Sequence, residues 1–151
     1  METGDYTWTV RVQRSDGPET RVYARNHSFA VGRQASFDAT DVQPSAVEYL
    51  LGALGGDLVA GFQAQAVRQR IPIDGLEMRL SGRLNNVLTH LGVVGEEGHP
   101  GFESITGTLY VGADAETQQL EAIWRTTLER SPVANTLKRC VALSLDLQIM
   151  T

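Results

Sequence analysis

The chain is almost without cysteine, and this scarcity limits its redox chemistry. Cys140 is the single cysteine among 151 residues, so an intrachain disulfide is excluded. His-Glu-x-x-His spacing and paired cysteines, which are typical of zinc sites, are absent as well. Carboxylate and imidazole ligands do gather in and beside a glycine-rich loop, at His90, Glu96, Glu97 and His99. Charged loop residues are more often simply solvated, so we expect no metal and no cofactor.

Positive charge is also in short supply. Lys and Arg number 13 against 18 Asp and Glu, which disfavours binding to a phosphate backbone. The N-terminal residues METGDYTWTV lack the basic, apolar and small-residue regions of a signal peptide. The apolar stretch at residues 47–62 is shorter than the ~20 residues of a membrane helix and is interrupted by Gly55, Gly56 and Asp57. We expect a cytoplasmic protein that binds neither nucleic acid nor membrane.

Hydrophobic periodicity indicates a mixture of strands and helices. A length of 151 residues suits one domain, so we expect residues 1–151 to form a single domain. Alternating apolar residues predict strands at 6–12, 21–24, 28–31, 76–84, 102–111 and about 141–149. Apolar residues at helical spacing predict a long helix over about 45–69 and an amphipathic helix that ends near 130. This element order is typical of the α+β class.

Two local signals mark where helices begin in the C-terminal part. Asp114 is a plausible N-cap for the amphipathic helix, because its carboxylate can accept a free backbone N–H. Ser131 followed by Pro132 is typical of an N-cap and first helical residue, and so predicts a short helical turn.

The segment Pro44–Phe62, PSAVEYLLGALGGDLVAGF, is apolar on nearly every face and yet carries Asp57 near its centre. Such a helix belongs in a core or an obligate interface, where an ionisable group needs a reason. Gly55 and Gly56 each cost ~1 kcal/mol in a helix interior relative to alanine, which favours a close approach of another backbone. The segment therefore predicts a buried, closely packed helix.

The same segment resembles the central helix of the OsmC/Ohr superfamily, the osmotically induced proteins C and organic hydroperoxide resistance proteins. Its proline, Glu48, leucines and small residues match the pattern P-x-x-x-E-x-L-L-x-A-L-G-x-C. A second match is Ser131-Pro132-Val133, which stands where similar proteins have C-P-V. The resemblance implies antiparallel sheets wrapped around a long central apolar helix, in an intertwined homodimer with active sites near the subunit interface.

The resemblance also implies a site, and this chain departs from it. The positions of the peroxide-reducing and resolving cysteines hold Asp57 and Ser131. Glu48 matches the glutamate that holds a catalytic arginine in similar enzymes, and Arg33 is the favoured candidate for that arginine, ahead of Arg25. Nine residues place Glu48 and Asp57 on opposite sides of a straight helix, ~13 Å apart, so only a second chain would let them share a pocket.

These replacements remove the chemistry of the family's peroxidases. A thiolate must attack the peroxide oxygen, and a second thiol must resolve the sulfenic acid that forms. Neither Asp57 nor Ser131 can perform these steps, and Cys140 is better read as a packing or surface thiol. We therefore expect no thiol peroxidase activity.

Several functions then remain open. The first is binding of a small hydrophobic molecule in a pocket at the dimer interface. The second is altered acid/base or hydrolytic chemistry centred on Asp57, with Ser131, Glu48 or an arginine assisting. A residual role in the response to organic peroxides or oxidative stress is a third. Asp57 as an interface hydrogen-bonding group and Ser131 as an N-cap are the purely structural alternatives.

Overall fold

The computed structural model describes residues 6–32 and 43–151. It divides the chain into two compact units, residues 1–50 and 51–151, and the boundary falls within helix α1 (Ala46–Arg68). The single domain that we expect over residues 1–151 stays a prediction.

The first unit is built on a three-stranded antiparallel meander in the order β1-β2-β3. Its strands are β1 (Arg11–Arg14), β2 (Thr20–Ala24) and β3 (His27–Val31). The latter two confirm the sequence prediction, but the strand predicted over 6–12 is displaced, since residues 6–10 lie outside β1. The reason is that β2 spans only five residues before the turn at Arg25, and its partners in β1 are residues 11–14.

Helix α1 confirms the predicted long helix almost to the residue. Its start is fixed by a capping box, in which the Glu48 carboxylate accepts hydrogen bonds from the Ser45 N–H and hydroxyl at 2.7 and 2.8 Å. Its end is marked by Arg70 in the left-handed region (φ 57°), where the Ile71 N–H bonds back to the Ala66 carbonyl. The apolar positions Leu54, Leu58, Phe62 and Ala66 are fully buried.

The second unit contains a sheet in the order β4-β5-β6, formed by β4 (Gly75–Leu84), β5 (Phe102–Gly112) and β6 (Ala142–Met150). β4 and β5 are antiparallel, whereas β6 runs parallel to β5. The α+β class is thus confirmed, with one strand departing from the expected antiparallel sheets. The helices between β5 and β6 return the chain to the end where β5 began, and that crossover makes the pair parallel.

The crossover consists of α3 (Thr117–Arg130) and the short α4 (Pro132–Leu137). The predicted N-cap Asp114 is wrong: Glu116 is the N-cap, and its N–H donates to the Gln119 side chain at 3.2 Å. The helix begins two residues later than predicted because the Gln119 side chain, at the third helical position, accepts the Glu116 N–H and fixes the cap there. Ser131 and Pro132 do open α4, as predicted.

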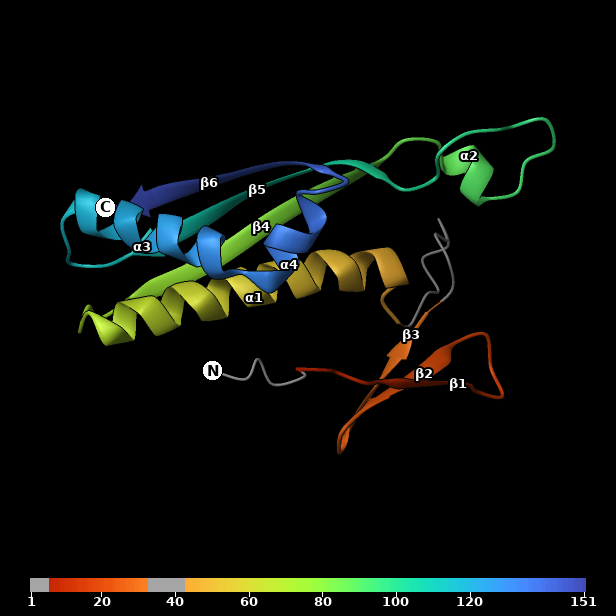
Figure 1. The fold of residues 1–151 in the computed structure, drawn as a ribbon, viewed down its shortest axis with the longest axis horizontal. Coiled ribbons are helices and arrows are strands. Elements are labelled where there is room, and N and C mark those ends of the chain that lie inside the picture. Colours follow the sequence, from red (N-terminus) through yellow and green to blue (C-terminus); the bar gives the residue numbers. More distant parts are fainter. Residues whose placement is uncertain (1–5, 33–42) are drawn as a thin grey trace. The chain divides into compact units, whose positions relative to one another are not determined.

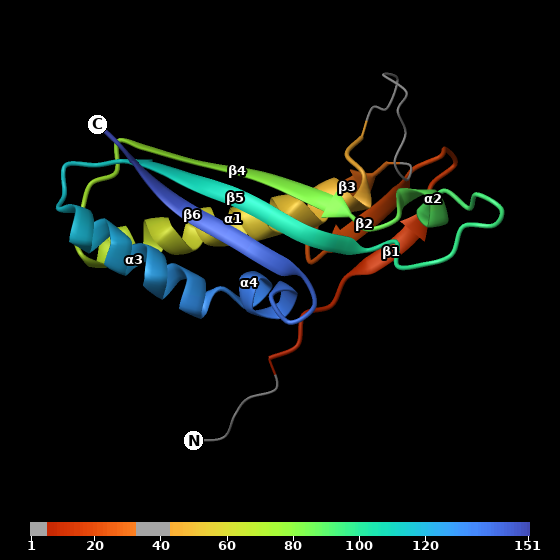
Figure 2. The ribbon, with the colours of Figure 1, turned by 90° about the horizontal axis from the view of Figure 1, so that it is seen from above.

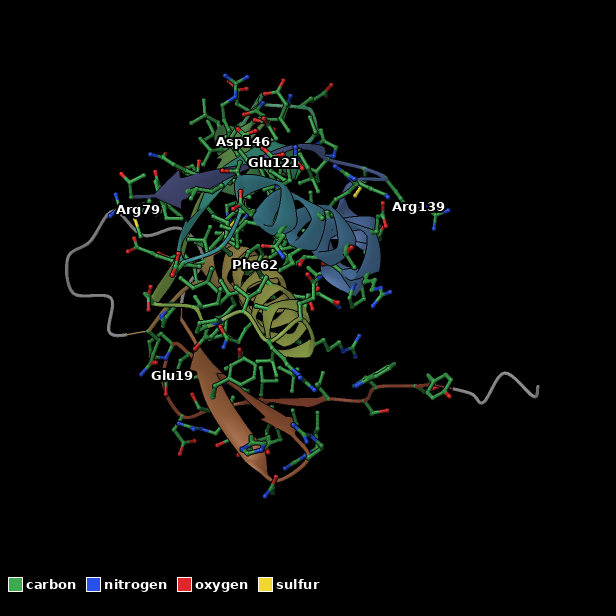
Figure 3. The ribbon with its side chains drawn as sticks, turned by 90° about the vertical axis from the view of Figure 1, so that its left-hand side faces the viewer. Glu19, Phe62, Arg79, Glu121, Arg139 and Asp146 are labelled. Atoms are coloured by element: carbon green, nitrogen blue, oxygen red, sulfur yellow. The ribbon has the colours of Figure 1, made fainter. Side chains whose placement is uncertain are left out.

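Helices α1 and α3 cover one face of the β4-β5-β6 sheet (Figures 1 and 2). The core between them is apolar, and Phe62 of α1 lies within it, whereas Arg79 and Asp146 lie at the periphery (Figure 3). Across the sheet, Met78, Leu109 and Leu147 stand opposite one another on the covered face. The alternate residues face away, which explains the strict alternation of the sequence.

The connection between β4 and β5, residues 85–101, extends beyond the end of the sheet and contains a short helix, α2 (Val87–His90), that the sequence pattern did not predict (Figure 1). Across residues 6–32 and 43–151, none of the helices has the length and apolarity needed to cross a membrane.

Candidate functional site

The folded chain brings Asp57 and Ser131 into direct contact, although 74 residues separate them in sequence. The Ser131 hydroxyl donates to Asp57 Oδ2 at 2.5 Å, and the Val133 backbone N–H donates to the same oxygen at 3.2 Å. Ser131 Oγ in turn accepts the Ala134 N–H at 3.0 Å. A carboxylate from α1 therefore sits at the N-terminus of α4, where free N–H groups and the helix dipole favour negative charge.

The corner between α3 and α4 holds Ser131 in this position. The Asn135 amide donates to the carbonyl oxygens of Leu128, Glu129 and Ser131, at 3.0, 3.1 and 2.6 Å. One side chain thus satisfies the last carbonyls of α3 and fixes the start of α4. Ser131 itself is only 4% exposed, so its hydroxyl is hardly accessible from solvent.

Asp57 is half-buried, and its partners are neutral donors rather than a cation. Within residues 51–151, no basic side chain forms an ion pair with it. Arg33, the predicted arginine of the site, lies outside the described residues. Arg25 has a positive φ of 56° and is exposed in the turn between β2 and β3.

Glu48 has a structural task of its own at the start of α1. The two hydrogen bonds from Ser45 stabilise its charged form and hold the pKa of its carboxyl below the ordinary value of 4.5. The sequence carries the signal for this cap, Ser45-x-x-Glu48 directly before an apolar run. Its role as holder of an arginine stays a prediction.

Cys140 lies in the turn before β6 and is exposed. Its thiol donates to the Leu137 carbonyl at 3.5 Å, so its closest polar partner is the end of α4 rather than Asp57 or Ser131. Two of the candidate metal ligands form hydrogen bonds within their own loop. His99 Nδ1 accepts the Gly101 N–H, and the Glu96 carboxylate accepts a hydrogen bond from the Asn86 side-chain amide.

A groove of about 440 Å³ lies beside α1 in the second unit. All of its lining residues are apolar or glycine: Leu51, Gly52, Gly55, Gly56, Val59, Met78 and Leu80. Asp57 is not among them, so the carboxylate and this groove are separate features of the helix.

Comparison with known proteins shows which family has this architecture. The model of the OsmC-like protein family matches residues 38–146, a span that includes Glu48, Asp57, Ser131 and the α3–α4 corner. The chain belongs to the OsmC-like protein family. No curated protein is similar to this OsmC-like chain at a significant level.

Solved structures agree on the fold. An OsmC-like protein from Mycoplasma pneumoniae superposes with a TM-score of 0.79 at 13% identity, over 97% of this chain and 99% of that one. The organic hydroperoxide resistance protein OhrB of Bacillus subtilis gives a TM-score of 0.61 at 16% identity, over 95% and 98%. A candidate organic hydroperoxide resistance protein of Vibrio cholerae gives 0.64 at 9%, over 97% and 95%. The OsmC/Ohr fold predicted from residues 44–57 and 131–133 is thereby confirmed.

Proposed function

We propose that this OsmC-like protein is a cytoplasmic homodimer that lacks thiol peroxidase activity and binds a small hydrophobic molecule. The observation that carries the first part is the contact between Asp57 and Ser131. The two positions that the family resemblance assigns to cysteines touch each other, as a redox pair must, but they meet through a hydroxyl and a carboxylate. Neither group can take an oxygen atom from a peroxide and be regenerated by a thiol.

A cysteine pair introduced at these positions tests this proposal. In Asp57→Cys/Ser131→Cys, one thiolate attacks the peroxide O–O bond, releases the alcohol and becomes a sulfenic acid. The second thiol displaces water to form a disulfide, and an added dithiol such as dithiothreitol reduces it. With cumene hydroperoxide as substrate, we expect no turnover in the native chain and measurable turnover in the double variant.

Cys140→Ser supplies the control for this assay. Because Cys140 is exposed and apart from Asp57, its removal should leave both results unchanged. Turnover by the native chain that Cys140→Ser abolishes would show that the remaining thiol is a peroxidase after all.

The second part of the proposal is supported by the groove beside α1. It is an open groove of about 440 Å³, and its lining of apolar side chains and glycine favours an apolar ligand.

Two variants on one strand separate groove binding from general surface adsorption. Met78→Gln places an amide in the groove at nearly constant size, whereas Glu77→Gln adds the same amide on the exposed face of β4. With 1-anilinonaphthalene-8-sulfonate as fluorescent probe, we expect binding to weaken in Met78→Gln and to persist in Glu77→Gln. Equal binding by both variants would place the probe elsewhere.

The homodimer is supported by the surface that α1 leaves exposed. Small side chains recur every four residues on it, at Gly52, Gly56, Ala60 and Ala64. A Cβ built on Gly52 or Gly56 meets nothing within 4 Å, so these glycines are not required by packing within the described chain. Close approach of a second helix explains them, because only small residues let two backbones come together. Gly52 and Gly56 also line the groove, so the second helix would close over the groove and place the ligand at the dimer interface.

Acid/base or hydrolytic chemistry at Asp57 is less well supported. The Ser131 hydroxyl does touch a carboxylate that could act as its base, but it is 4% exposed and already accepts the Ala134 N–H. A nucleophile must reach its substrate, and this hydroxyl is committed to capping a helix.

A further inference from the structure

The connection between β4 and β5 is much longer than its position requires. These strands are antiparallel neighbours, which hairpin loops of about two to five residues commonly join. Here residues 85–101 make the connection. Long loops in compact domains usually carry a function.

The connection is held in shape by its own hydrogen bonds. Asn86 Oδ1 accepts the N–H groups of Leu88 and Thr89 at 3.1 and 3.3 Å, and caps α2. Its amide nitrogen donates to the Glu96 side chain and the Glu97 carbonyl, both at 3.3 Å. Asn86 thus links the two ends of the loop by hydrogen bonds. The segment between them is therefore held in an ordered conformation at the surface.

The exposed side chains of this segment are mainly apolar. Leu88, Leu91, Val93 and Val94, which we call the apolar tip, are 43%, 45%, 44% and 99% exposed. Single exposed apolar residues are ordinary on protein surfaces, but a cluster on an ordered projection indicates an interaction surface.

The charge beside the apolar tip narrows the choice of partner. Glu96 and Glu97 follow it directly, and within residues 51–151 neither forms an ion pair. Two carboxylates disfavour an anionic bilayer and favour a protein surface that combines apolar area with positive charge.

This chain offers such a surface in its first unit. Trp8, Val10 and Val12 are 85%, 57% and 59% exposed, and they alternate along the chain with Arg14 next in the series. Val12 and Arg14 lie in β1, where residues two apart point the same way, and Trp8 and Val10 continue this alternation in the sequence just before the strand. We call these four residues the Trp8 face. It is apolar along most of its length and cationic at its end.

We propose that the apolar tip of one protomer docks on the Trp8 face of a second copy, with Glu96 and Glu97 toward Arg14. The inference rests on the proposed homodimer and names a contact within it. Because a two-fold dimer repeats every contact, each dimer contains this one twice.

Directed cross-linking tests the contact. Two differently tagged chains, both carrying Cys140→Ser, are co-expressed, one with Val94→Cys and the other with Trp8→Cys. Under mild oxidation we expect a mixed disulfide dimer on a non-reducing gel. The control pairs Val94→Cys with Gln118→Cys, an exposed site on α3, and should give no mixed dimer. Equal linkage in both pairs would overturn the inference.

Light scattering on the uncross-linked native protein separates this inference from the proposed homodimer. A dimer that fails to cross-link through positions 94 and 8 overturns the docking contact alone. A monomer overturns both.

Charge exchange gives a second, independent test. Glu96→Arg/Glu97→Arg should raise the dimer dissociation constant about tenfold or more, measured by sedimentation, because it sets like charges against Arg14. Adding Arg14→Glu should restore the native value. Failure of Arg14→Glu to rescue the double variant would overturn the pairing.

Discussion

At the scale of single residues, Asp57 acts first as a hydrogen-bond acceptor. Asp57→Ala leaves the Val133 N–H and the Ser131 hydroxyl without their partner, and we expect the free energy of unfolding to fall by about 1–3 kcal/mol. Asp57→Asn keeps an acceptor oxygen and should lose less. Urea unfolding measures both.

Asp146→Ala is the matched control for Asp57→Ala. Asp146 is exposed on β6, so its truncation should change stability by no more than about 0.5 kcal/mol. If Asp57→Ala proves as harmless as Asp146→Ala, the carboxylate does not tie α1 to α4, and its retention needs a ligand or a substrate to explain it.

Glu48 predicts a pH dependence whose sign follows from its lowered pKa. A carboxyl with a depressed pKa in the folded state contributes stability that is present above its unfolded pKa and is lost as pH falls through the folded pKa. We expect native protein to be more stable than Glu48→Gln at neutral pH. The difference in free energy of unfolding between the two proteins should narrow as the pH falls below the ordinary carboxyl pKa of 4.5. Urea unfolding midpoints measured across this pH range test the prediction. A stability difference that does not change with pH would contradict the role of the charged Glu48 carboxylate in the cap.

Residue identity explains why part of the site was predictable. Ser131 as an N-cap follows from Ser-Pro chemistry, and the structure confirms it. Asn135 carried no usable signal, because its importance comes from the α3–α4 corner, where three carbonyl groups converge on its amide.

At the scale of elements, the contact between α1 and the sheet depends on missing side chains. Leu80 of β4 lies close to where a Cβ would stand on Gly55 of α1 and on Gly107 of β5. A Cβ on Gly107 would also come within 2.8 Å of the Arg79 carbonyl oxygen, which as backbone cannot move aside. Gly107→Ala should therefore lower stability by about 1–3 kcal/mol.

Gly17→Ala serves as the control, since a Cβ there meets nothing within 4 Å. Thermal unfolding should show a clear loss for Gly107→Ala and little change for Gly17→Ala. Equal melting temperatures in the two variants would contradict the tight packing around Leu80.

Element prediction succeeded where one periodicity dominated. Residues 142–150 alternate strictly, and β6 alternates between half-buried and exposed positions as expected. Element prediction failed where contacts with neighbouring segments determine the structure. Tyr6 to Val10 alternate just as well, but β2 is too short to pair with them. Helix α2 depends on the cap that Asn86 provides. It is too short for a hydrophobic periodicity to be recognised in the sequence.

At the scale of the whole molecule, the small-residue surface of α1 predicts the oligomeric state. Gly56→Leu adds a side chain at an exposed position of α1 where a Cβ meets nothing within 4 Å, so we expect the single chain to keep its fold. If a second α1 packs there, the variant should be monomeric by light scattering and keep its helical circular dichroism. Gly17→Leu, at another open glycine, should remain dimeric. A dimeric Gly56→Leu would place the interface elsewhere.

The sequence by itself determined the family, the α+β class, the long helix and the absence of a second thiol, because these depend on local pattern and on residue identity. Only the tertiary structure decided that the Asp57 carboxylate meets Ser131 and the N-terminus of α4, and that the groove beside α1 excludes Asp57. Those facts depend on contacts across 74 residues, which arise from packing α1 and the α3–α4 corner against one sheet. Local periodicity carries no information about such contacts.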